Sequence, residues 1–389
     1  MRSVTIVGAS LAGLSAARAL RAESFDGRIT VVGDERHEPY DRPPLSKEFL
    51  AGKAGLADIA LSTEDDAGLD LDWRLGTTAA RLDPARRAVV LDSGEELVSD
   101  GVVLATGARA RTPRGSALVD VHTLRSLDDA VALRADLLAG GPVVVIGAGF
   151  IGAEVASTAR ALGLDVTVVE ILPTPLAGPL GEEMGGHVAA LHQDNGTTLV
   201  TGVGVVGFVG GSRTEAVRLA DGRELSAATV VCGIGATPNI EWLAGSGIET
   251  GAGVRTDARC ATSIPGVVAV GDCASAHNPF AGEALRLEHW TNALQQPAVA
   301  AATLLGRRAD LRPAPPYFWS DQYGVRLQFA GHRRPGDTVE VVDGDPDSRS
   351  FCAVYRRAGR PVAVLALDRP KLFGRLRRQL VAPEPEVVR

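Results

Sequence analysis

The chain has 389 residues, of which 45% are hydrophobic and 22% charged, and its formal net charge is −7. This size allows two or three domains with apolar cores. The negative charge argues against nucleic-acid binding, which needs a basic surface. No apolar run approaches the roughly 18 residues of a membrane span, and no signal peptide precedes the first strand. We therefore expect a soluble, cytoplasmic protein with no membrane partner.

The N-terminal region has the pattern of a dinucleotide-binding βαβ unit. An apolar run, a glycine-rich loop, a helical stretch and a second apolar run follow in order at residues 4–7, 8–13, 11–22 and 29–32. In this unit the glycines form a tight turn, and the N-terminus of the helix faces a phosphate. Ser10 stands where the motif has its second glycine. Asp34 or Glu35, after the second strand, is placed to hold a ribose.

The chain that follows is less regular. Residues 37–70 are rich in proline, and we expect irregular structure there. Strands are predicted at 88–91 and 102–104, and the second of them ends at Thr106 and Gly107.

A second βαβ unit begins after Pro142. Its strand, loop, helix and strand are predicted at residues 143–146, 147–152, 151–162 and 166–169. This loop has all three glycines of the motif. Glu170 closes the second strand, where a carboxylate accepts hydrogen bonds from ribose hydroxyls and repels a 2′-phosphate, so we expect NADH rather than NADPH. Two such loops in one chain indicate two nucleotides, a flavin and a nicotinamide held face to face.

The end of the second unit mirrors that of the first. Residues 230–235 are predicted to form a strand that ends in glycine, as residues 102–107 are, and another predicted strand at 267–270 ends at Gly271 and Asp272. We therefore predict an α/β fold with two Rossmann-like nucleotide-binding domains, the second inserted into the first. The predicted domains are an FAD-binding domain at 1–111 and 239–312, an NADH-binding domain at 112–238 and a C-terminal domain at 313–389.

The composition changes after residue 312. Short alternating strands are predicted at 325–330, 339–342, 351–355 and 362–367, followed by a basic helix, which indicates a small α+β domain. The tail at 383–386 is expected to be disordered. Residues 307–378 contain fifteen Lys and Arg against eight Asp and Glu, so this region carries +7 and the rest −14. Either a docking surface for an acidic partner or a solvated face without a partner accounts for this asymmetry.

The four cysteines are scattered without a CxxC pair, at Cys232, Cys260, Cys273 and Cys352. A disulfide scaffold or a zinc site is therefore not expected, and no metal ligand is predicted. None of the four lies between the two glycine-rich loops, so the flavin has no sequence-local dithiol to reduce. We expect its electrons to leave the protein.

Four short segments carry a more specific signal than the glycine loops. They are residues 38–47 (EPYDRPPLSK), 271–273 (GDC), 287–293 (LEHWTNA) and 318–323 (FWSDQY). With them the chain resembles the FAD-dependent NADH:ferredoxin reductases of the glutathione reductase-like superfamily, most weakly after Arg333. The disulfide reductases of that superfamily carry a redox cysteine pair where this chain has residues 43–47 (PPLSK), which excludes the disulfide and peroxidase branches.

The resemblance implies FAD contacts at seven residues, Ala12, Asp34, Lys47, Ala80, Arg125, Asp272 and Trp290. Further candidate FAD-binding residues in these regions are Gly8, Ser10, Leu11, Gly13, Glu35, Arg42, Thr106, Gly107, Gly271, Glu288 and His289. Candidate residues for the second nucleotide are Gly147, Gly149, Phe150, Ile151, Gly152, Glu170 and Gly235. Ser10 and Pro297, where related chains commonly have glycine, leave the affinity for FAD open.

Three candidate catalytic residues follow from the resemblance. Lys47 is one of only three lysines among 40 basic residues, and an ammonium beside the flavin ring would favour its anionic reduced form. Glu154, just past the second loop, is placed to pair with Lys47 where nicotinamide meets flavin. The resemblance puts Trp319 beside the flavin, on the side from which electrons leave. Tyr317, Phe318 and Trp319 equally suit the core of the third domain.

The expected function is electron transfer from NADH through FAD to a small acidic [2Fe–2S] ferredoxin docked on the basic C-terminal face. That ferredoxin would feed a cytochrome P450 or an oxygenase. The alternatives are a rubredoxin reductase, an NADH oxidase, or a flavoprotein with mainly a binding role, like apoptosis-inducing factor. The oligomeric state, the particular ferredoxin and the pathway stay open.

Overall fold

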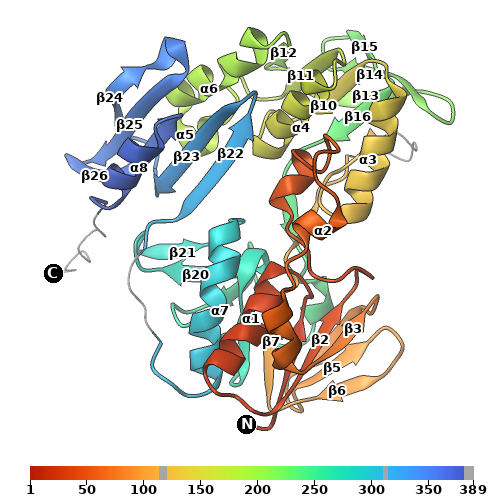
Figure 1. Ribbon diagram of the computed structural model, residues 1–389, viewed down its shortest axis with the longest axis vertical. Helices are drawn as coiled ribbons and strands as arrows, with labels where there is room; N and C mark the ends of the chain where they lie inside the picture. Colours follow the sequence, from red (N-terminus) through yellow and green to blue (C-terminus); the bar gives the residue numbers. More distant parts are fainter. Residues whose placement is uncertain (114–120, 310–313, 381–389) are drawn as a thin grey trace.

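The computed structural model describes residues 1–113, 121–309 and 314–380. It contains three main sheets (Figure 1). The sheet of the first glycine loop lies at the bottom of the view, the sheet of the second loop at the upper right, and the C-terminal sheet at the upper left. The α/β class and the two Rossmann-like domains predicted from the sequence are confirmed.

The first glycine loop belongs to a parallel sheet of order β19-β7-β1-β2-β3. Its strands are β1 (Ser3–Val7), β2 (Arg28–Gly33), β3 (Leu71–Leu75), β7 (Gly101–Leu104) and β19 (Val267–Ala269). One apolar face packs against two helices, α1 (Leu11–Ala22) and α7 (Trp290–Leu304). The other packs against an antiparallel sheet of β4 (Ala79–Asp83), β5 (Ala88–Leu91) and β6 (Glu96–Val98). The carboxyl ends of the parallel strands therefore meet at one edge, beside the loop.

The second loop belongs to a parallel sheet of order β12-β11-β10-β16-β9. Its strands are β9 (Val121–His122), β10 (Val143–Ile146), β11 (Val166–Glu170), β12 (Thr198–Thr201) and β16 (Thr229–Cys232). The helices around it are α3 (Leu127–Ala139), α4 (Phe150–Ala161), α5 (Ala177–Leu180) and α6 (Glu182–Asp194). A small antiparallel sheet covers its other face, with β13 (Val205–Gly210), β14 (Thr214–Leu219) and β15 (Glu224–Ser226). This is the same architecture as the first domain.

The C-terminal part is an antiparallel sheet of order β22-β23-β26-β25-β24 followed by a short helix. Its elements are β22 (Tyr317–Gln322), β23 (Val325–Gly331), β24 (Thr338–Asp345), β25 (Ser350–Arg357), β26 (Arg360–Leu367) and α8 (Pro370–Arg377). The four strands and the basic helix predicted from the sequence are present. The fifth strand, β22, was not predicted, because its aromatic residues also suited a simple core cluster.

Short elements join the three sheets. The chain leaves the first domain through β8 (Ala108–Ala110) and returns through β17 (Ala236–Pro238), which pair with each other as expected for an inserted domain. The remaining strands are β18 (Val254–Thr256), β20 (Ala274–Asn278) and β21 (Glu283–Leu285). The other short helices are η1 (Pro43–Ser46), α2 (Leu56–Ile59), η2 (Glu64–Leu69), η3 (Glu241–Leu243), η4 (Gly271–Cys273) and η5 (Pro346–Ser348). The prediction of irregular structure at 37–70 was therefore wrong for η1, α2 and η2.

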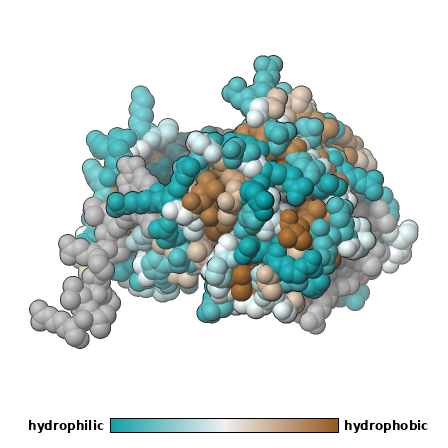
Figure 2. Space-filling view, turned by 90° about the horizontal axis from the view of Figure 1, so that it is seen from below, coloured by the Kyte–Doolittle hydropathy of each residue, from teal (hydrophilic) through white to brown (hydrophobic). Residues whose placement is uncertain are grey.

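The tail at 383–386 lies outside the described residues. Within the described ranges, no helix combines the length and apolar character needed to cross a membrane. No group of three or more His, Cys, Asp or Glu side chains there could hold a metal ion. The lower end of the molecule, shown in Figure 2, has apolar residues in separate areas between hydrophilic ones.

Candidate functional site

The first glycine loop is fixed by contacts within the protein. A Cβ on Gly8 would lie 2.1 Å from the carbonyl oxygen of Ala105, and one on Gly13 would lie 1.8 Å from the carbonyl oxygen of Gly8. Both positions therefore require glycine. Ser10, the departure from the motif, precedes α1 as its N-cap, and its Oγ lies 3.4 Å from Nε of Arg42. The loop thus accommodates Ser10 without strain on its two essential glycines.

The second loop shows which glycine the fold does not need. A Cβ on Gly147 would lie 2.4 Å from the carbonyl oxygen of Gly233, and one on Gly152 would lie 2.0 Å from that of Gly147. At Gly149 the nearest atom to such a Cβ would be 3.9 Å away. A Cβ at Gly149 would therefore make only an ordinary van der Waals contact, so packing within the protein does not require glycine there. Gly149 precedes the N-terminus of α4, where a dinucleotide phosphate approaches the backbone in this fold. The residues present fit a nucleotide.

Glu170 ends β11 next to this loop and is buried, with 9% of its surface exposed. Its Oε2 accepts a hydrogen bond of 2.8 Å from the amide of Ala148, and its Oε1 accepts one of 2.9 Å from the amide of Leu172. Each carboxylate oxygen has further acceptor capacity for a ribose hydroxyl. Glu170 therefore both shapes the loop and carries the negative charge predicted there.

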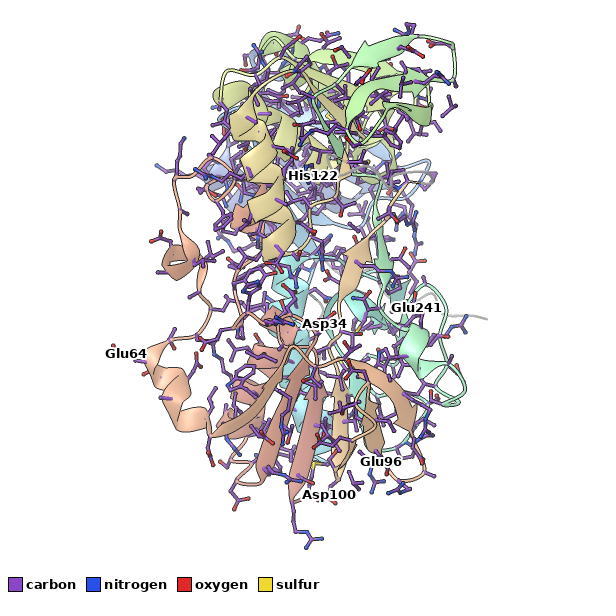
Figure 3. The ribbon with its side chains drawn as sticks, turned by 90° about the vertical axis from the view of Figure 1, so that its right-hand side faces the viewer. Asp34, Glu64, Glu96, Asp100, His122 and Glu241 are labelled. Atoms are coloured by element: carbon purple, nitrogen blue, oxygen red, sulfur yellow. The ribbon has the colours of Figure 1, made fainter. Side chains whose placement is uncertain are left out.

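The two acidic residues after β2 are in different environments. Glu35 accepts hydrogen bonds from the Tyr40 hydroxyl at 2.5 Å and from Nη2 of Arg42 at 2.6 Å. Asp34 is exposed at the carboxyl edge of the sheet, the end away from Glu96 and Asp100 in Figure 3. Of the two carboxylates, that of Asp34 is therefore the one left for a ligand.

Two arginines converge beside the first loop. Arg42 donates from Nη1 to the carbonyl oxygen of Arg125 at 2.5 Å, in addition to its bond with Glu35. Arg125 donates from Nη2 to Oδ2 of Asp272 at 2.6 Å. This network joins the proline-rich segment, the residues before α3 and η4 at the carboxyl edge of the first sheet. Two guanidinium groups and the N-terminus of α1 together suit a pyrophosphate.

The predicted pair of Lys47 and Glu154 is present. Nζ of Lys47 lies 2.8 Å from Oε2 of Glu154, and the two side chains are 14% and 4% exposed. The Ser46 hydroxyl donates to Oε2 at 2.5 Å, and the Ser320 hydroxyl donates to Oε1 at 2.7 Å. The amide of Asp321 is a further donor to Oε1, at 3.4 Å. A nearly inaccessible carboxylate on α4, in the second domain, is thus held by groups from the first domain and from the C-terminal part.

Trp319 belongs to a row of aromatic rings. Nε1 of Trp290 donates to Oδ1 of Asp41 at 2.7 Å, and burial raises the pKa of this carboxyl group. The ring of Trp290 meets that of Trp319 edge to face at 5.9 Å, and Trp319 stacks on Tyr317 at 6.0 Å. The guanidinium of Arg377 lies 4.4 Å from the centre of the Tyr317 ring. The row leads from the first domain to α8.

A second aromatic group lies on the other side of β22. Phe318 packs against Phe150 with ring centres 4.7 Å apart and against His289 at 5.1 Å. Burial lowers the pKa of His289 to about 4, so its ring is neutral near pH 7. Its Nδ1 is buried and has no partner among the described residues. Phe150 and His289 are both predicted site residues. Phe150 packs against Phe318, whereas Nδ1 of His289 is available to bind a ligand.

The remaining predicted residues lie outside the networks described above. Ala80 is exposed and lies at a bulge of β4. Ile151 is 45% exposed, and Glu288 is paired with Arg286. The hydroxyl of Thr106 donates to the carbonyl oxygen of Asn239. Gly107, Gly235 and Gly271 all adopt positive φ angles, and Leu11 and Ala12 are buried in α1.

Sequence reasoning missed four residues that contact the predicted ones. They are Tyr40, Asp41, Ser46 and Ser320. All four lie inside the segments EPYDRPPLSK and FWSDQY, so those motifs contained the signal. Gln296 was missed too, and its Oε1 accepts the amide of Gly271 at 2.8 Å. No local pattern indicates that contact.

The four thiols are buried and unpaired. Burial raises the pKa of Cys232 and of Cys260 to about 12 and that of Cys352 to about 11. It also raises the pKa of Cys273, the neighbour of Asp272. Because the thiolate is the reactive form, these cysteines suit no dithiol chemistry.

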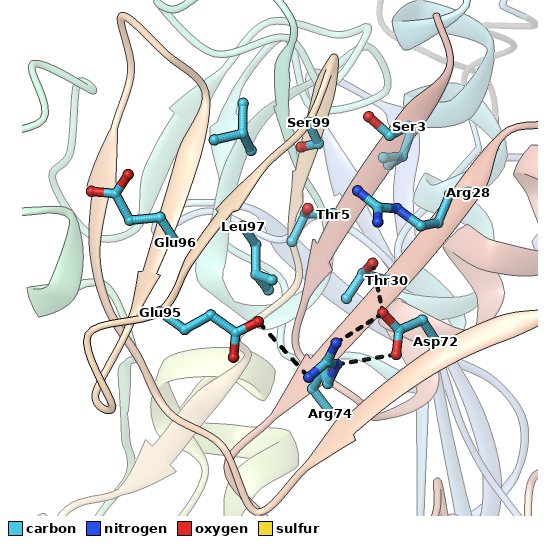
Figure 4. Close-up of a pocket in the computed structure, with 12 residues that line it drawn as sticks. Ser3, Thr5, Arg28, Thr30, Asp72, Arg74, Glu95, Glu96, Leu97 and Ser99 are labelled. Atoms are coloured by element: carbon cyan, nitrogen blue, oxygen red, sulfur yellow. Dashed lines mark hydrogen bonds and ion pairs between the residues drawn. The ribbon is translucent and has the colours of Figure 1, made fainter.

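A cavity of about 190 Å³ lies elsewhere in the first domain (Figure 4). It lies between β1, β2, β3 and the chain around β6, and its polar lining includes the linked Asp72, Arg74 and Glu95. Ser3, Arg28 and Ser99, at the amino ends of their strands or just before, also line it. The cavity is therefore separate from the loops at the carboxyl edge.

Comparisons with known proteins place the chain in a family. The pyridine nucleotide-disulphide oxidoreductase model matches residues 2–297, and the reductase C-terminal model matches residues 317–387. The ferredoxin–NAD(+) reductase component of the anthranilate 1,2-dioxygenase system of Burkholderia cepacia is 38% identical, covering 98% of this chain and 95% of that protein. Putidaredoxin reductase of Pseudomonas putida is 36% identical, with coverages of 95% and 90%.

A solved structure is similar to this chain over nearly its whole length. The covalent putidaredoxin reductase–putidaredoxin complex gives a TM-score of 0.93 at 34% identity, covering 99% of this chain and 95% of the matched chain. The family that matches residues 2–297 implies a flavin and NAD(H) as cofactors. The chain belongs to the pyridine nucleotide-disulphide oxidoreductase family, in its group of ferredoxin–NAD(+) reductases.

Proposed function

We propose that this chain is an NADH-dependent reductase that delivers electrons through FAD to a small acidic [2Fe–2S] ferredoxin, which serves a cytochrome P450 or an oxygenase. The observation that carries the proposal is the aromatic row of Trp290, Trp319 and Tyr317. It connects the candidate flavin domain to the basic helix α8, in a site with no reactive thiol. Relatives named as reductases of dioxygenase systems, and the putidaredoxin complex, support it.

The residues around the first loop would hold FAD. Arg42 and Arg125, with the N-terminus of α1, would neutralise its pyrophosphate, and Asp34 would accept hydrogen bonds from its ribose. Lys47, held by Glu154, would present its ammonium to the flavin ring. FAD, when bound, accepts a hydride and gives up electrons singly.

The second loop would hold NADH. Gly149, which packing within the protein does not require, and the N-terminus of α4 suit its pyrophosphate. The negative charge of Glu170 favours a free 2′-hydroxyl over a 2′-phosphate. No Lys or Arg follows Glu170 in the next ten residues to counter this charge. NADH is therefore the proposed donor.

The helix α8 and its end suit an acidic partner. Lys371, Arg375, Arg377 and Arg378 form no ion pair within the described residues, whereas most other cations of the C-terminal part are paired. Arg377 also covers Tyr317, at the outer end of the aromatic row. Unpaired cations at this point would steer and hold an acidic iron–sulfur protein.

The test is a panel of electron acceptors under anaerobic conditions. Holoenzyme with NADH is expected to reduce a [2Fe–2S] ferredoxin rapidly and rubredoxin more slowly, and NADPH is expected to be a poor donor. Oxygen consumption without a carrier should be slow. Rapid oxygen consumption would favour an NADH oxidase, and failure to reduce any ferredoxin or rubredoxin would refute the proposal.

A further inference from the structure

The strand β22 presents its residues alternately to two different sites. Tyr317 and Trp319 lie on the side of the aromatic row, which ends at Arg377. Phe318 and Ser320 lie on the other side, against Phe150 and Glu154. This alternation is the normal two-residue period of a strand. Adjacent residues of one strand therefore contact the candidate exit for electrons and the candidate hydride side.

The Ser320 hydroxyl is inaccessible to solvent and has one strong acceptor. Ser320 is 0% exposed, and its Oγ donates to Oε1 of Glu154 at 2.7 Å. Nε2 of Gln322, also buried, donates to the same Oγ at 3.0 Å. Since a hydroxyl has only one hydrogen, the bond from Gln322 directs that hydrogen toward Glu154.

Ser320 and Lys47 hold different oxygens of the same carboxylate. Lys47 and Ser46 bind Oε2, whereas Ser320 binds Oε1. Without Ser320, the amide of Asp321, at 3.4 Å, would be the only donor left on Oε1 among the described residues, and the carboxylate would be free to rotate about its last bond. The direction in which Glu154 presents Oε2 to Lys47 thus depends on the C-terminal domain.

We propose that Ser320 is a positioning residue for the reductive half of the reaction, acting through Glu154 on Lys47. The inference rests on the proposed function, because it takes the Lys47–Glu154 pair as the hydride side of the site. Ser320 belongs to the C-terminal domain, which would bind the ferredoxin. The proposal gives this residue a role in the earlier step, in which the enzyme accepts electrons from NADH. Correct seating of β22 is then a requirement for flavin reduction as well as for electron exit.

The test compares Ser320→Ala with a matched control, Ser99→Ala. Ser99 is 5% exposed, donates to the carbonyl oxygen of Gly101 at 2.8 Å and lines the separate cavity of the first domain. We expect Ser320→Ala holoenzyme to be bleached by NADH about tenfold more slowly, the effect of a lost charge-assisted hydrogen bond. Its flavin midpoint potential should become more negative, because the Glu154 charge is less neutralised. The dissociation constant of oxidised ferredoxin should stay within about twofold, since Trp319 is unchanged.

A double-mutant cycle with Glu154→Gln tests whether Ser320 acts through Glu154. The slowing by Ser320→Ala should largely disappear in the Glu154→Gln background, whereas effects on independent sites add. Ser320→Thr, which keeps the hydroxyl, should restore the potential toward that of the unmodified protein. Additive effects, or a potential and a bleaching rate equal to those of Ser99→Ala, would overturn the inference. If NADH does not bleach the unmodified holoenzyme, the proposed function itself fails.

Discussion

Glu154 and Glu170 illustrate two uses of a buried carboxylate at the residue scale. Glu154 accepts from an ammonium and two hydroxyls, and these groups come from distant parts of the chain. Glu170 accepts from two backbone amides close to it in the sequence and so fixes its own loop. Removing a side-chain donor from Glu154 therefore leaves a buried charge with fewer donors, which is costly. At Glu170 the donors belong to its own loop, which can relax around a change.

For Lys47→Ala, we expect NADH to bleach the flavin at least about tenfold more slowly, because the fixed ammonium beside the ring is lost. The same change leaves Glu154 buried with hydroxyl and amide donors only, so we also expect the free energy of unfolding to fall by about 1–3 kcal/mol. Stopped-flow absorbance and denaturant unfolding measure the two effects. Lys53→Ala, at an exposed lysine of the same segment, is the control. Equal bleaching rates for the two variants would remove Lys47 from the site.

For Glu170→Gln, we expect the Michaelis constant for NADH to rise about tenfold while that for NADPH changes less, so that the preference for NADH narrows. The reason is that the charge opposing a 2′-phosphate is removed while the size of the side chain is kept. Glu215→Gln, at an exposed glutamate of the same domain, is the control. An unchanged preference in Glu170→Gln would refute the role of Glu170.

At the element scale, two helices pack against the C-terminal sheet. The helix α6 belongs to the second domain, whereas α8 belongs to the C-terminal part itself. Nδ1 of His192, near the end of α6, lies 2.8 Å from the hydroxyl of Tyr323, in the turn after β22. The helix α8 instead packs Phe373 into an apolar cluster and leaves Lys371, Arg375 and Arg378 exposed. One helix is therefore expected to set stability, and the other to set recognition of the partner.

The contact of α6 predicts a dependence of stability on pH. Burial lowers the pKa of His192 to about 4, from about 6.5 in an unfolded chain. The unfolded state therefore binds the proton more tightly, so the contribution is complete above about pH 6.5 and is lost as pH falls toward 4. Its full size is about 3 kcal/mol. Calorimetric melting between these pH values should show a shallower pH dependence for His192→Gln than for the unmodified protein, and parallel curves would contradict this.

The cations of α8 predict a dependence of partner binding on charge. Arg377→Glu should weaken binding of an acidic ferredoxin by about tenfold or more at low salt, and the difference should shrink at high salt. Arg360→Glu, an exposed arginine at the opposite end of β26, makes the same charge change away from the aromatic row. Titration calorimetry measures both variants. Equal weakening by the two would mean that net charge, rather than α8, attracts the partner.

At the scale of the whole molecule, the repeated βαβ units and the strand ends could be predicted because each depends on residues close together in the chain. The loops, Glu170 and the pair of Lys47 and Glu154 are where the sequence patterns indicate. The contacts of Glu154 with Ser46 and Ser320 could not be predicted, because they join residues 108 and 166 positions apart. Only the packing of three domains brings them together. The strand β22 was missed because a run of aromatic residues fits a strand and a core cluster equally well.

The electron balance between NADH and ferredoxin tests the central claim most directly. Anaerobic holoenzyme, either untreated or treated beforehand with a thiol-alkylating reagent, is mixed with limiting NADH and an excess of oxidised [2Fe–2S] ferredoxin. One NADH carries two electrons and each ferredoxin accepts one, so we expect about two ferredoxins to be reduced per NADH, with or without alkylation. A yield far below this ratio, or a yield that alkylation abolishes, would contradict an electron route through the flavin and the aromatic row.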